Sequence, residues 1–300
     1  MENFKSGFVT LVGRTNVGKS TLVNALVKEH VAITTNKPQT TRTAIKAILN
    51  SEKYQIVITD TPGIHKPKTK LGETMMNTAF DMFTKVDAIM FIIEADSDKI
   101  GKGDRIILDK IKEIRKPCIL LINKIDLIKK EKLLEIIKLY NEEYEFSSII
   151  PISAIDDKYT ENIIKEILKI LPDGLKYYPD DEYTDQTMRQ MVEEIIREKA
   201  LKFLNEEIPH GIYIETEKFK YRKTTKNEDI YDIDIVIYCL KESHKGIIIG
   251  KNGNLLKKIA TYTRQDAEKM LDSKVNLKVW VKVKEDWHEN DSIVNKFKLK

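Results

Sequence analysis

The eight residues GRTNVGKS, from Gly13 to Ser20, constrain the fold of this chain more than any other stretch. They match the pattern G-x-x-x-x-G-K-[ST] and lie between an apolar run, FVTLV, and an amphipathic stretch, STLVNAL. A glycine-rich turn between a strand and a helix lets successive backbone N–H groups curl around a phosphate. We therefore predict a strand, a phosphate-binding loop and a helix near the start of the chain.

The residue types within this loop suit a nucleoside triphosphate. Gly13 and Gly18 allow the backbone to surround a β-phosphate, Lys19 reaches the β- and γ-phosphate oxygens, and Ser20 offers its hydroxyl to Mg²⁺. A second motif, Asp60-Thr-Pro-Gly63, follows the apolar run YQIVIT. It places a carboxylate where it can hold Mg²⁺ through water, and a glycine N–H where it can meet a γ-phosphate.

A third motif, Asn123-Lys-Ile-Asp126, follows the run CILLI and predicts which base is bound. The Asp126 carboxylate can accept hydrogen bonds from both the ring N–H and the exocyclic amine of guanine, whereas adenine presents no such pair of donors. Sites built on such bonds reject the wrong partner by ~10⁴ or more. We expect Asn123 to tie this loop to the first motif and Lys124 to lie against the base.

A fourth motif, Ser153-Ala-Ile155, follows the run IIP, and we expect the Ala154 N–H to meet guanine O6. Four motifs in this order over residues 7–170 resemble the translation-factor-like GTPases of the P-loop class. The resemblance places switch I at NKPQTTRT, residues 36–43, where one threonine closes on Mg²⁺. Thr41 is the preferred residue and Thr40 the alternative.

Together these motifs predict a complete site for GTP or GDP with Mg²⁺. The catalytic residues are expected to be Lys19, Ser20, Thr41, Asp60 and Gly63, and the metal ligands Ser20, Thr41 and Asp60. The expected nucleotide contacts are Gly13, Arg14, Thr15, Asn16, Val17, Gly18, Lys19, Ser20, Thr21, Asp60, Thr61, Pro62, Gly63, Asn123, Lys124, Asp126, Ser153, Ala154 and Ile155.

One position departs from the Ras-like pattern. Ile64 follows DTPG where Ras-type enzymes carry a glutamine that orients water, and an isoleucine cannot do so. We therefore expect slow unaided hydrolysis, completed by another residue, a monovalent cation or a bound partner. Asn16 is a candidate potassium ligand, as in related GTPases with asparagine there, or a purely structural residue. His65 is a further candidate, although a solvated loop histidine is the simpler interpretation.

Strand-like and helix-like runs alternate from residue 7 to 170, which predicts βαβ units and a mostly parallel sheet with helices on both faces. The stretch LPDGLKYYPDDEYTD that follows, with Pro172, Gly174 and Pro179, is typical of a linker. Beyond it the order α-β-β-α-α-β indicates a smaller α+β module. We place the α/β GTP-binding domain at 1–172, the linker at 173–183 and the second domain at 184–300.

A second glycine loop near the C-terminus, GIIIGKN, is not a second nucleotide site. It has three residues between its glycines instead of four, and Asn252 stands where magnesium chemistry needs Ser or Thr. IIGKNGNLLKKI between two helices instead fits the K-homology (KH) pattern, in which a GXXG loop meets a nucleic-acid backbone and a groove holds about four unpaired bases. The module order indicates the prokaryotic type II form. Its expected RNA contacts are Ile249, Gly250, Lys251, Asn252, Gly253 and Lys257.

Charge supports a polyanionic partner for this second module. The net charge is +4, yet Lys241 to Lys284 alone carries 11 basic and 4 acidic residues.

Cys118 and Cys239 lie in apolar runs, which suits buried thiols without a chemical role. No apolar run approaches the ~20 residues that span a bilayer and no signal peptide is evident, so we expect a cytoplasmic protein.

The two modules together, with QTTRT, DTPGIH, IREK and WVKVKEDW, are similar to the bacterial ribosome-assembly GTPases of the TrmE-Era-EngA-like family that end in a KH domain. The resemblance implies GTP hydrolysis, binding to the 3′ end of small-subunit (16S) ribosomal RNA, and a role in 30S subunit assembly. We expect the protein to be a monomer. Two alternatives remain open. One is a signalling GTPase peripheral to the inner face of the cell membrane, and the other is an RNA-binding scaffold without turnover.

Overall fold

The computed structural model describes residues 3–35, 37, 40–64, 67, 69–96 and 99–297. These residues form two compact units, the first running to Asp185 and the second comprising Gln186–Lys296. In the described ranges, no helix is long and apolar enough to cross a membrane.

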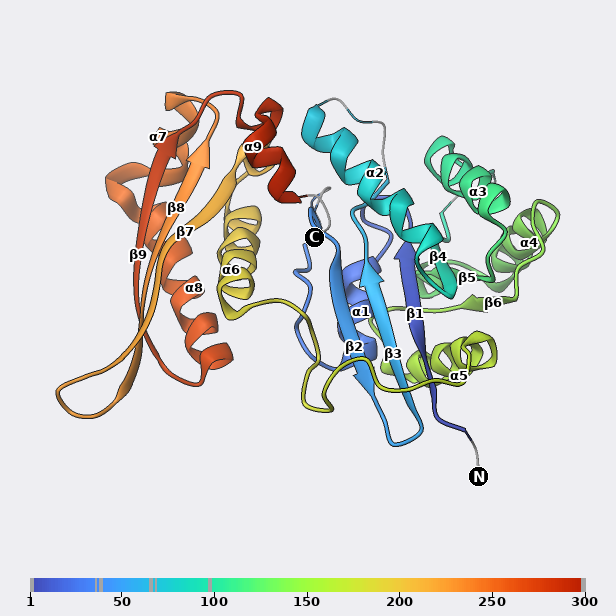
Figure 1. Cartoon of the computed structure of the whole chain (residues 1–300). Helices are drawn as coiled ribbons and strands as arrows, with labels where there is room; N and C mark the ends of the chain where they lie inside the picture. Colours follow the sequence, from blue (N-terminus) through green and yellow to red (C-terminus); the bar gives the residue numbers. More distant parts are fainter. Residues whose placement is uncertain are drawn as a thin grey trace. The chain divides into compact units, whose positions relative to one another are not determined.

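The first unit is a sheet with helices on both faces (Figure 1). Among its described residues six strands pair in the order β2-β3-β1-β4-β5-β6, parallel except for β2, which is antiparallel to β3. The strands are β1 (Lys5–Val12), β2 (Ile45–Asn50), β3 (Tyr54–Asp60), β4 (Ala88–Glu94), β5 (Cys118–Asn123) and β6 (Ser148–Pro151). The helices are α1 (Lys19–Val27), α2 (Lys70–Thr84), α3 (Lys102–Ile114), α4 (Lys130–Asn141) and α5 (Thr160–Ile170).

Two apolar layers hold this sheet between its helices. Leu22 of α1 and Ile163 of α5 pack on one face, and Phe83 of α2, Ile107 of α3 and Ile136 of α4 pack on the other. The central strands β4 and β5 are buried on both faces, as their nearly continuous apolar sequence requires. This confirms the predicted α/β sheet, while β2 was not predicted.

Residues 173–185 belong to the first unit, and residues 183 and 184 pair with the edge strand β2. The fully buried Gln55 side chain accepts hydrogen bonds from the Tyr177 and Tyr178 N–H groups at 2.6 and 3.0 Å and donates to the Tyr178 carbonyl at 2.8 Å. The Ile48 N–H donates to the Tyr183 carbonyl at 3.0 Å. The stretch predicted as a linker therefore covers the edge of the sheet.

The second unit has one mixed sheet, within the described residues, in the order β7-β8-β9. Its elements are α6 (Met188–Phe203), β7 (Tyr213–Lys223), β8 (Asp229–Cys239), α7 (Glu242–Ile249), α8 (Asn254–Leu271), β9 (Lys274–Val283) and α9 (Asp291–Val294). The order from α6 to β9 confirms the predicted α-β-β-α-α-β module. Ile196 of α6 and Ile259 of α8 pack against Ile235 of β8, so the helices cover one face of the sheet.

Helix α6 begins at a capping box. The Thr187 hydroxyl accepts from the Gln190 N–H and the Gln190 side chain accepts from the Thr187 N–H, so two exposed N–H groups are satisfied at the junction between the units. Both cysteines are free and buried, Cys118 in the first unit and Cys239 in the second. This agrees with the expected buried thiols.

Candidate nucleotide site and nucleic-acid interface

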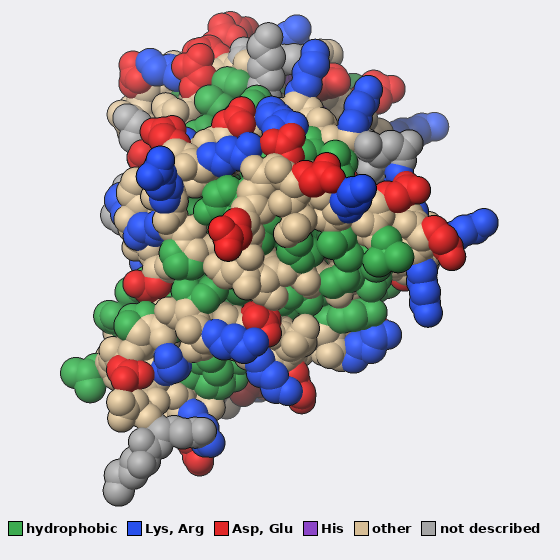
Figure 2. All heavy atoms as spheres, turned by 90° about the vertical axis from the view of Figure 1, so that its right-hand side faces the viewer, with side chains coloured by type: hydrophobic (Ala, Val, Ile, Leu, Met, Phe, Trp, Pro, Cys, Tyr) green, Lys and Arg blue, Asp and Glu red, His purple; other side chains and the backbone are tan. Residues whose placement is uncertain are grey.

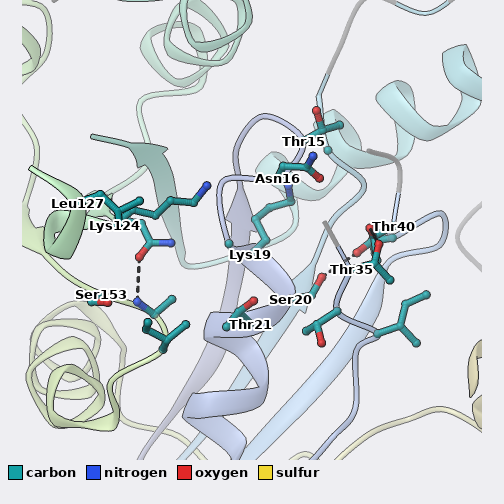
Figure 3. Close-up of a pocket in the computed structure, with 18 of the residues that line it drawn as sticks. Thr15, Asn16, Lys19, Ser20, Thr21, Thr35, Thr40, Lys124, Leu127 and Ser153 are labelled. Atoms are coloured by element: carbon teal, nitrogen blue, oxygen red, sulfur yellow. Dashed lines mark hydrogen bonds between the residues drawn. The ribbon is translucent and has the colours of Figure 1, made fainter. Parts of the chain in front are cut away.

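A cavity of about 480 Å³ lies in the first unit where loops leave β1, β5 and β6. These strands are parallel neighbours of one sheet, so their carboxyl ends meet at one edge, the usual place for a ligand in such folds. Figure 3 shows Thr15, Asn16, Lys19, Ser20 and Thr21 from the first loop and α1, with Lys124, Leu127 and Ser153 on the opposite side. Four motifs far apart in sequence thus enclose one space.

The first loop is shaped by Gly18, whose φ of 100° is a left-handed conformation that favours glycine. Helix α1 starts directly after it, so its first N–H groups have no side-chain cap at Gly18 and are directed to the loop. The Lys19 ammonium donates to the carbonyls of Arg14 at 2.8 Å and Gly13 at 3.2 Å. Backbone donors and one cation therefore converge, which is an arrangement suited to phosphate.

Burial lowers the pKa of Lys19 to about 8, and the nearby Asp60 carboxylate partly opposes this shift. The side chain is 6% exposed, so the ammonium has lost most of its hydration. An anionic ligand placed beside it would restore the charged form. The electrostatics of the loop therefore favour phosphate over a neutral ligand.

Three oxygen-bearing side chains meet beside this loop. The Ser20 hydroxyl donates to Asp60 Oδ2 at 2.8 Å, the Thr41 hydroxyl donates to the same oxygen at 3.1 Å, and the two hydroxyls are 3.0 Å apart. Two hydroxyls and a carboxylate are hard oxygen ligands of the kind Mg²⁺ takes from proteins. The residues present therefore fit the predicted metal set.

Thr40 points to different partners. Its hydroxyl donates to the Lys37 carbonyl at 2.7 Å and lies 2.9 Å from the Thr35 hydroxyl. Both threonines line the cavity, but the geometry brings Thr41, and not Thr40, to Asp60.

At the other end of the cavity Asn123 joins two loops. Its amide nitrogen donates to the Val17 carbonyl at 2.7 Å, and its amide oxygen accepts from the Ala154 N–H at 2.8 Å. Asp126 accepts a hydrogen bond from the Ser153 hydroxyl at 2.6 Å, which orients its carboxylate. The three loops therefore form one connected wall at the base end.

The Arg14 side chain lies outside the cavity and forms ion pairs there. Its guanidinium Nε lies 2.9 Å from Asp104 Oδ2 on α3, and its Nη2 lies 3.5 Å from Asp96 Oδ1. Asp104 is buried, and burial raises the pKa of its carboxyl although Arg14 opposes this shift. Lys124 pairs with Glu94, the last residue of β4, at 2.7 Å, so carboxylates at and beyond the end of β4 hold side chains of both the phosphate loop and the base loop.

Most of the predicted nucleotide contacts line the cavity, namely Thr15, Asn16, Gly18, Lys19, Ser20, Thr21, Gly63, Asn123, Lys124, Asp126, Ser153, Ala154 and Ile155. The other predicted contacts, which are not part of the cavity lining, are Gly13, Arg14, Val17, Asp60, Thr61 and Pro62. The Val17 side chain is in the core, and the Thr61 hydroxyl donates to the Leu11 carbonyl at 2.8 Å. At Val17 and Thr61 a ligand contact would therefore come from the backbone.

Ile64 is 2% exposed and packs in the core, while its N–H donates to the Gly13 carbonyl at 3.1 Å. Its side chain therefore contributes to core packing and brings no polar group to the cavity. His65, the further candidate, lies outside the described residues.

Four residues that line the cavity were not predicted from the sequence: Ile33, Thr34, Thr35 and Leu127. Leu127 directly follows Asp126, and its 72% exposure beside the base loop marks it as a surface for a flat apolar ligand. The segment 33–35 precedes switch I and carries no motif of its own. Only its position against the first loop places it in the site.

In the second unit the predicted GXXG loop joins α7 to α8. Gly250 and Gly253 have φ of 73° and 74°, and Asn252 between them is also left-handed at 53°. Lys251, Asn252 and Lys257 are exposed, whereas Ile249 packs against the core beneath. Ile247, which was not predicted, is 51% exposed. The loop therefore presents backbone and positive charge outwards.

Family models match both units. A model described as "50S ribosome-binding GTPase" matches residues 8–124, and a KH domain model matches residues 207–288. The GTPase Era of Thermoanaerobacter sp. (strain X514) is 50% identical over 97% of this chain and 95% of its own length. The GTPase Era of Clostridioides difficile (strain 630) is 52% identical over 98% of each chain.

This chain belongs to the Era family of GTPases. A solved structure of Era in complex with MgGDPNP and nucleotides 1506–1542 of 16S ribosomal RNA is 37% identical, with a TM-score of 0.92 over 98% of both chains. Aquifex aeolicus Era bound to GDP·AlF₄⁻ gives the same identity and TM-score, covering 98% of this chain and 99% of that one. The chain is accordingly a GTPase with a P-loop domain and a C-terminal KH domain.

Proposed function

We propose that this Era-family GTPase binds the 3′ end of 16S ribosomal RNA through its KH domain and acts in assembly of the 30S subunit. The observation that carries the proposal is that one chain joins the nucleotide cavity to an outward-facing GXXG loop. The Era structure with TM-score 0.92 holds both MgGDPNP and 16S nucleotides 1506–1542, which supports the same pair of ligands here. The small subunit is therefore favoured over the large one.

The chain's own residues would position the triphosphate. Lys19 lies between the Gly13 and Arg14 carbonyls and would turn its charge to the β- and γ-phosphates, and Gly63 would donate its N–H to the γ-phosphate. Ser20, Thr41 and Asp60 would hold Mg²⁺, which when bound neutralises charge on the phosphate oxygens. Fixed donors of this kind stabilise the charge that develops during hydrolysis.

The base would be read by Asp126, with Lys124 and Leu127 against the ring and the Ala154 N–H at O6. Asp126→Asn should move the preference from guanine toward xanthine nucleotides, because an amide donor suits the xanthine carbonyl where the carboxylate suited the guanine amine. Competition between GTP and XTP for the purified protein measures the change. Unaltered preference for GTP would overturn this assignment of the base-reading residue.

Hydrolysis would gate the RNA contact. With GTP bound, Thr41 and Gly63 would grip the γ-phosphate side and order the switch segments, and release of phosphate would free them. We expect RNA affinity to differ between GDPNP-bound and GDP-bound protein in a titration with 16S nucleotides 1506–1542. Equal affinities would exclude the coupling but leave RNA binding intact.

Potassium would complete the site in place of a water-orienting glutamine. Asn16 lines the cavity with a left-handed φ of 65°, which carries its side chain beside the phosphate position. GTP turnover should be faster in potassium than in sodium, and Asn16→Ala should remove this difference. Equal rates in the two salts would contradict the cation role.

We propose that the protein works as a cytoplasmic monomer, with peripheral attachment to the inner face of the cell membrane as the alternative. Crosslinking the protein to RNA in cells and sequencing the bound fragments tests the main proposal directly. Enrichment of the 16S 3′ end is expected. Recovery of only unrelated RNA would contradict the proposal. Salt-sensitive binding to anionic vesicles that RNA does not compete would favour the membrane alternative, and absence of GTP turnover with or without ribosomal subunits would favour a scaffold.

A further inference from the structure

The second unit has a sheet face that its helices leave uncovered. Strand β9 directs Val275, Leu277, Val279, Val281 and Val283 into the core with α6 and α8. Because side chains alternate along a strand, the intervening side chains point to the opposite face. On β9 these are Asn276, Lys278, Trp280 and Lys282.

Trp280 is the unusual member of this row, because this large aromatic residue is 42% exposed. Lysines on an edge strand have a simple explanation, since charge there discourages pairing with a second chain. An exposed tryptophan has the opposite effect, because it adds a flat apolar surface that favours association. Protection of the edge therefore accounts for Lys278 and Lys282 but not for the residue between them.

The neighbouring strands add both basic and acidic side chains to this face, with Lys218, Lys220 and Arg222 beside Glu215, Asp232 and Asp234. Lys218 and Arg222 of β7 both pair with Asp232 of β8, at 3.6 and 2.8 Å. The Arg222 and Asn276 hydrogen bonds hold the pKa of Asp232 well below its usual range, so this acid is fully charged and fully neutralised by its partners. Lys220 lies opposite Asp232 in the register and adds a positive charge, whereas Asp234 lies between Lys218 and Lys278 and offsets part of the positive charge of the face.

At the β9 edge the lysines are accessible to a ligand. Lys282 pairs with Glu217 at 2.8 Å, with side chains 50% and 46% exposed, and such surface pairs exchange partners readily. Lys278 is exposed, and the Lys284 ammonium lies 5.2 Å from the ring centre of Tyr238 on the strand beside it. Successive same-face residues are about 6.6 Å apart along a strand, so positive charge, indole and positive charge follow in one line.

In the described part of the C-terminal segment, the contacts with this face are made to β7, the strand furthest from β9. Trp287 packs 5.5 Å from Tyr213 of β7, and Lys296 donates to the Tyr213 hydroxyl at 3.0 Å. Trp287 is 1% exposed, in contrast to Trp280. The part of the face nearest β9 is the part left open within the described residues of the unit.

We propose that this open face, with Trp280 between Lys278 and Lys282, is a second RNA-contacting surface that takes an unpaired strand. A base stacks on the Trp280 indole while flanking phosphates meet the lysines, which is how proteins hold single strands without reading sequence. The proposal rests on the RNA binding proposed above and extends it, because the GXXG loop holds only about four nucleotides. Longer RNA would continue onto this face.

Intrinsic fluorescence gives a direct test, because the chain has two tryptophans and only Trp280 is accessible. Titration of the full-length protein with 16S nucleotides 1506–1542 should quench its fluorescence, as expected when a base stacks on an indole. Trp280→Phe should remove the quenching while retaining most of the affinity. Quenching that persists in Trp280→Phe would contradict the stacking, as would RNA binding to the wild type with no quenching.

Affinity for RNAs of two lengths separates this face from the GXXG loop. Trp280→Ala should weaken binding of the long RNA about 5- to 100-fold, the loss expected for one stacked base, and leave a single-stranded tetranucleotide unaffected. Lys278→Gln with Lys282→Gln should reduce the slope of log K against log salt by about 1.4, since each phosphate contact of a single strand contributes about 0.7. Lys138→Gln with Lys169→Gln, exposed lysines of the first unit, is the matched control and should change neither.

Three other outcomes would overturn the proposal, each pointing to a different explanation. Equal weakening of binding to both RNAs would assign the effect to the GXXG site or to misfolding of the variant. An unfolding midpoint equal to that of the wild type would exclude misfolding. Loss of binding to vesicles of phosphatidylcholine and phosphatidylglycerol, with RNA affinity unchanged, would assign the face to a membrane. If the wild type bound neither RNA, the proposed function itself would fail.

Discussion

The two glycine loops of this molecule bring backbone toward phosphate in opposite settings. A Cβ added at Gly18 would lie 2.2 Å from the Asn123 amide nitrogen, so the residue is surrounded by another loop of the site. A Cβ added at Gly253 would meet nothing within 4 Å. Both glycines have positive φ, yet only the first is also required by its neighbours.

This difference separates an enclosing site from a contacting one. Lys19 in the first loop is 6% exposed and has a lowered pKa, whereas Lys251 in the second is exposed to solvent. A buried cation interacts strongly with one ligand and is little screened, while an exposed cation contributes weakly and loses strength with salt. The enclosed loop therefore suits one triphosphate, and the open loop suits a strand that extends beyond it.

The largest effect is expected from Gly18→Ala. The added methyl group would displace Asn123, and a non-glycine residue at φ of 100° adds strain of about 1–2 kcal/mol. GTP affinity should fall at least about 100-fold, which corresponds to about 2.8 kcal/mol, as measured by calorimetry. Gly101→Ala, whose added Cβ would come no closer than 3.7 Å to its neighbours, is the control. A Gly18→Ala protein that binds GTP normally would show that the loop is not enclosed in solution.

The next largest expected difference between the two loops is the salt dependence of ligand affinity. Four phosphate contacts of a single strand give a slope of about 2.8, so raising salt from about 50 to 200 mM should weaken binding of short RNA about 50-fold. GTP affinity at constant Mg²⁺ should change only a few-fold, because Lys19 is buried. Filter binding across a salt series measures both, and parallel slopes for the two ligands would remove the distinction.

Charge reversal at the open loop should have a smaller effect on RNA alone. Lys251→Glu replaces an attraction with a repulsion and should weaken RNA binding about tenfold, or about 1.4 kcal/mol, with GTP affinity unchanged. The control is Lys269→Glu, about 24 Å further along α8 with an 82% exposed side chain. Equal losses for the two variants would indicate a general charge effect instead of a contact at the loop.

The smallest effects concern stability of the second unit, where both tryptophans lie, so fluorescence-detected urea unfolding reports on it. Gly253→Ala should destabilise the unit by about 1–2 kcal/mol because of its φ of 74°. Gly246→Ala, within α7 and with open space around the added Cβ, should stabilise it by up to about 1 kcal/mol. Destabilisation by both would mean that α7 is not an ordinary helix at Gly246.

Much of the fold follows from local sequence signals. The apolar runs of β1, β3, β4, β5 and β6 were predicted, as was the order of the second unit, because strand-like and helix-like periodicities are strong there. Strand β2 was missed because IKAILN alternates weakly. Pairing with β3 on one side and with residues 183–184 on the other stabilises it, and neither partner is visible in the local pattern.

The candidate site, like the fold, could be predicted from the sequence only in part. Motif residues such as Lys19, Asp60 and Asp126 can be named from their spacing because the chemistry restricts their types. The choice between Thr40 and Thr41 could not be made from sequence, since both are threonines in one short segment. Distance to Asp60 separates them, and that distance depends on how two distant loops approach.

The sequence by itself determined a P-loop GTPase joined to a KH module, because glycine, lysine, serine and aspartate at fixed spacings leave few alternatives for phosphate and base recognition. Only the tertiary structure decided that Arg14 is anchored on α3, that Gln55 binds residues 177 and 178 against the sheet, and that Trp280 remains exposed. These features depend on which faces are buried when elements pack. Burial and long-range contacts are properties of the folded chain, and local spacing does not encode them.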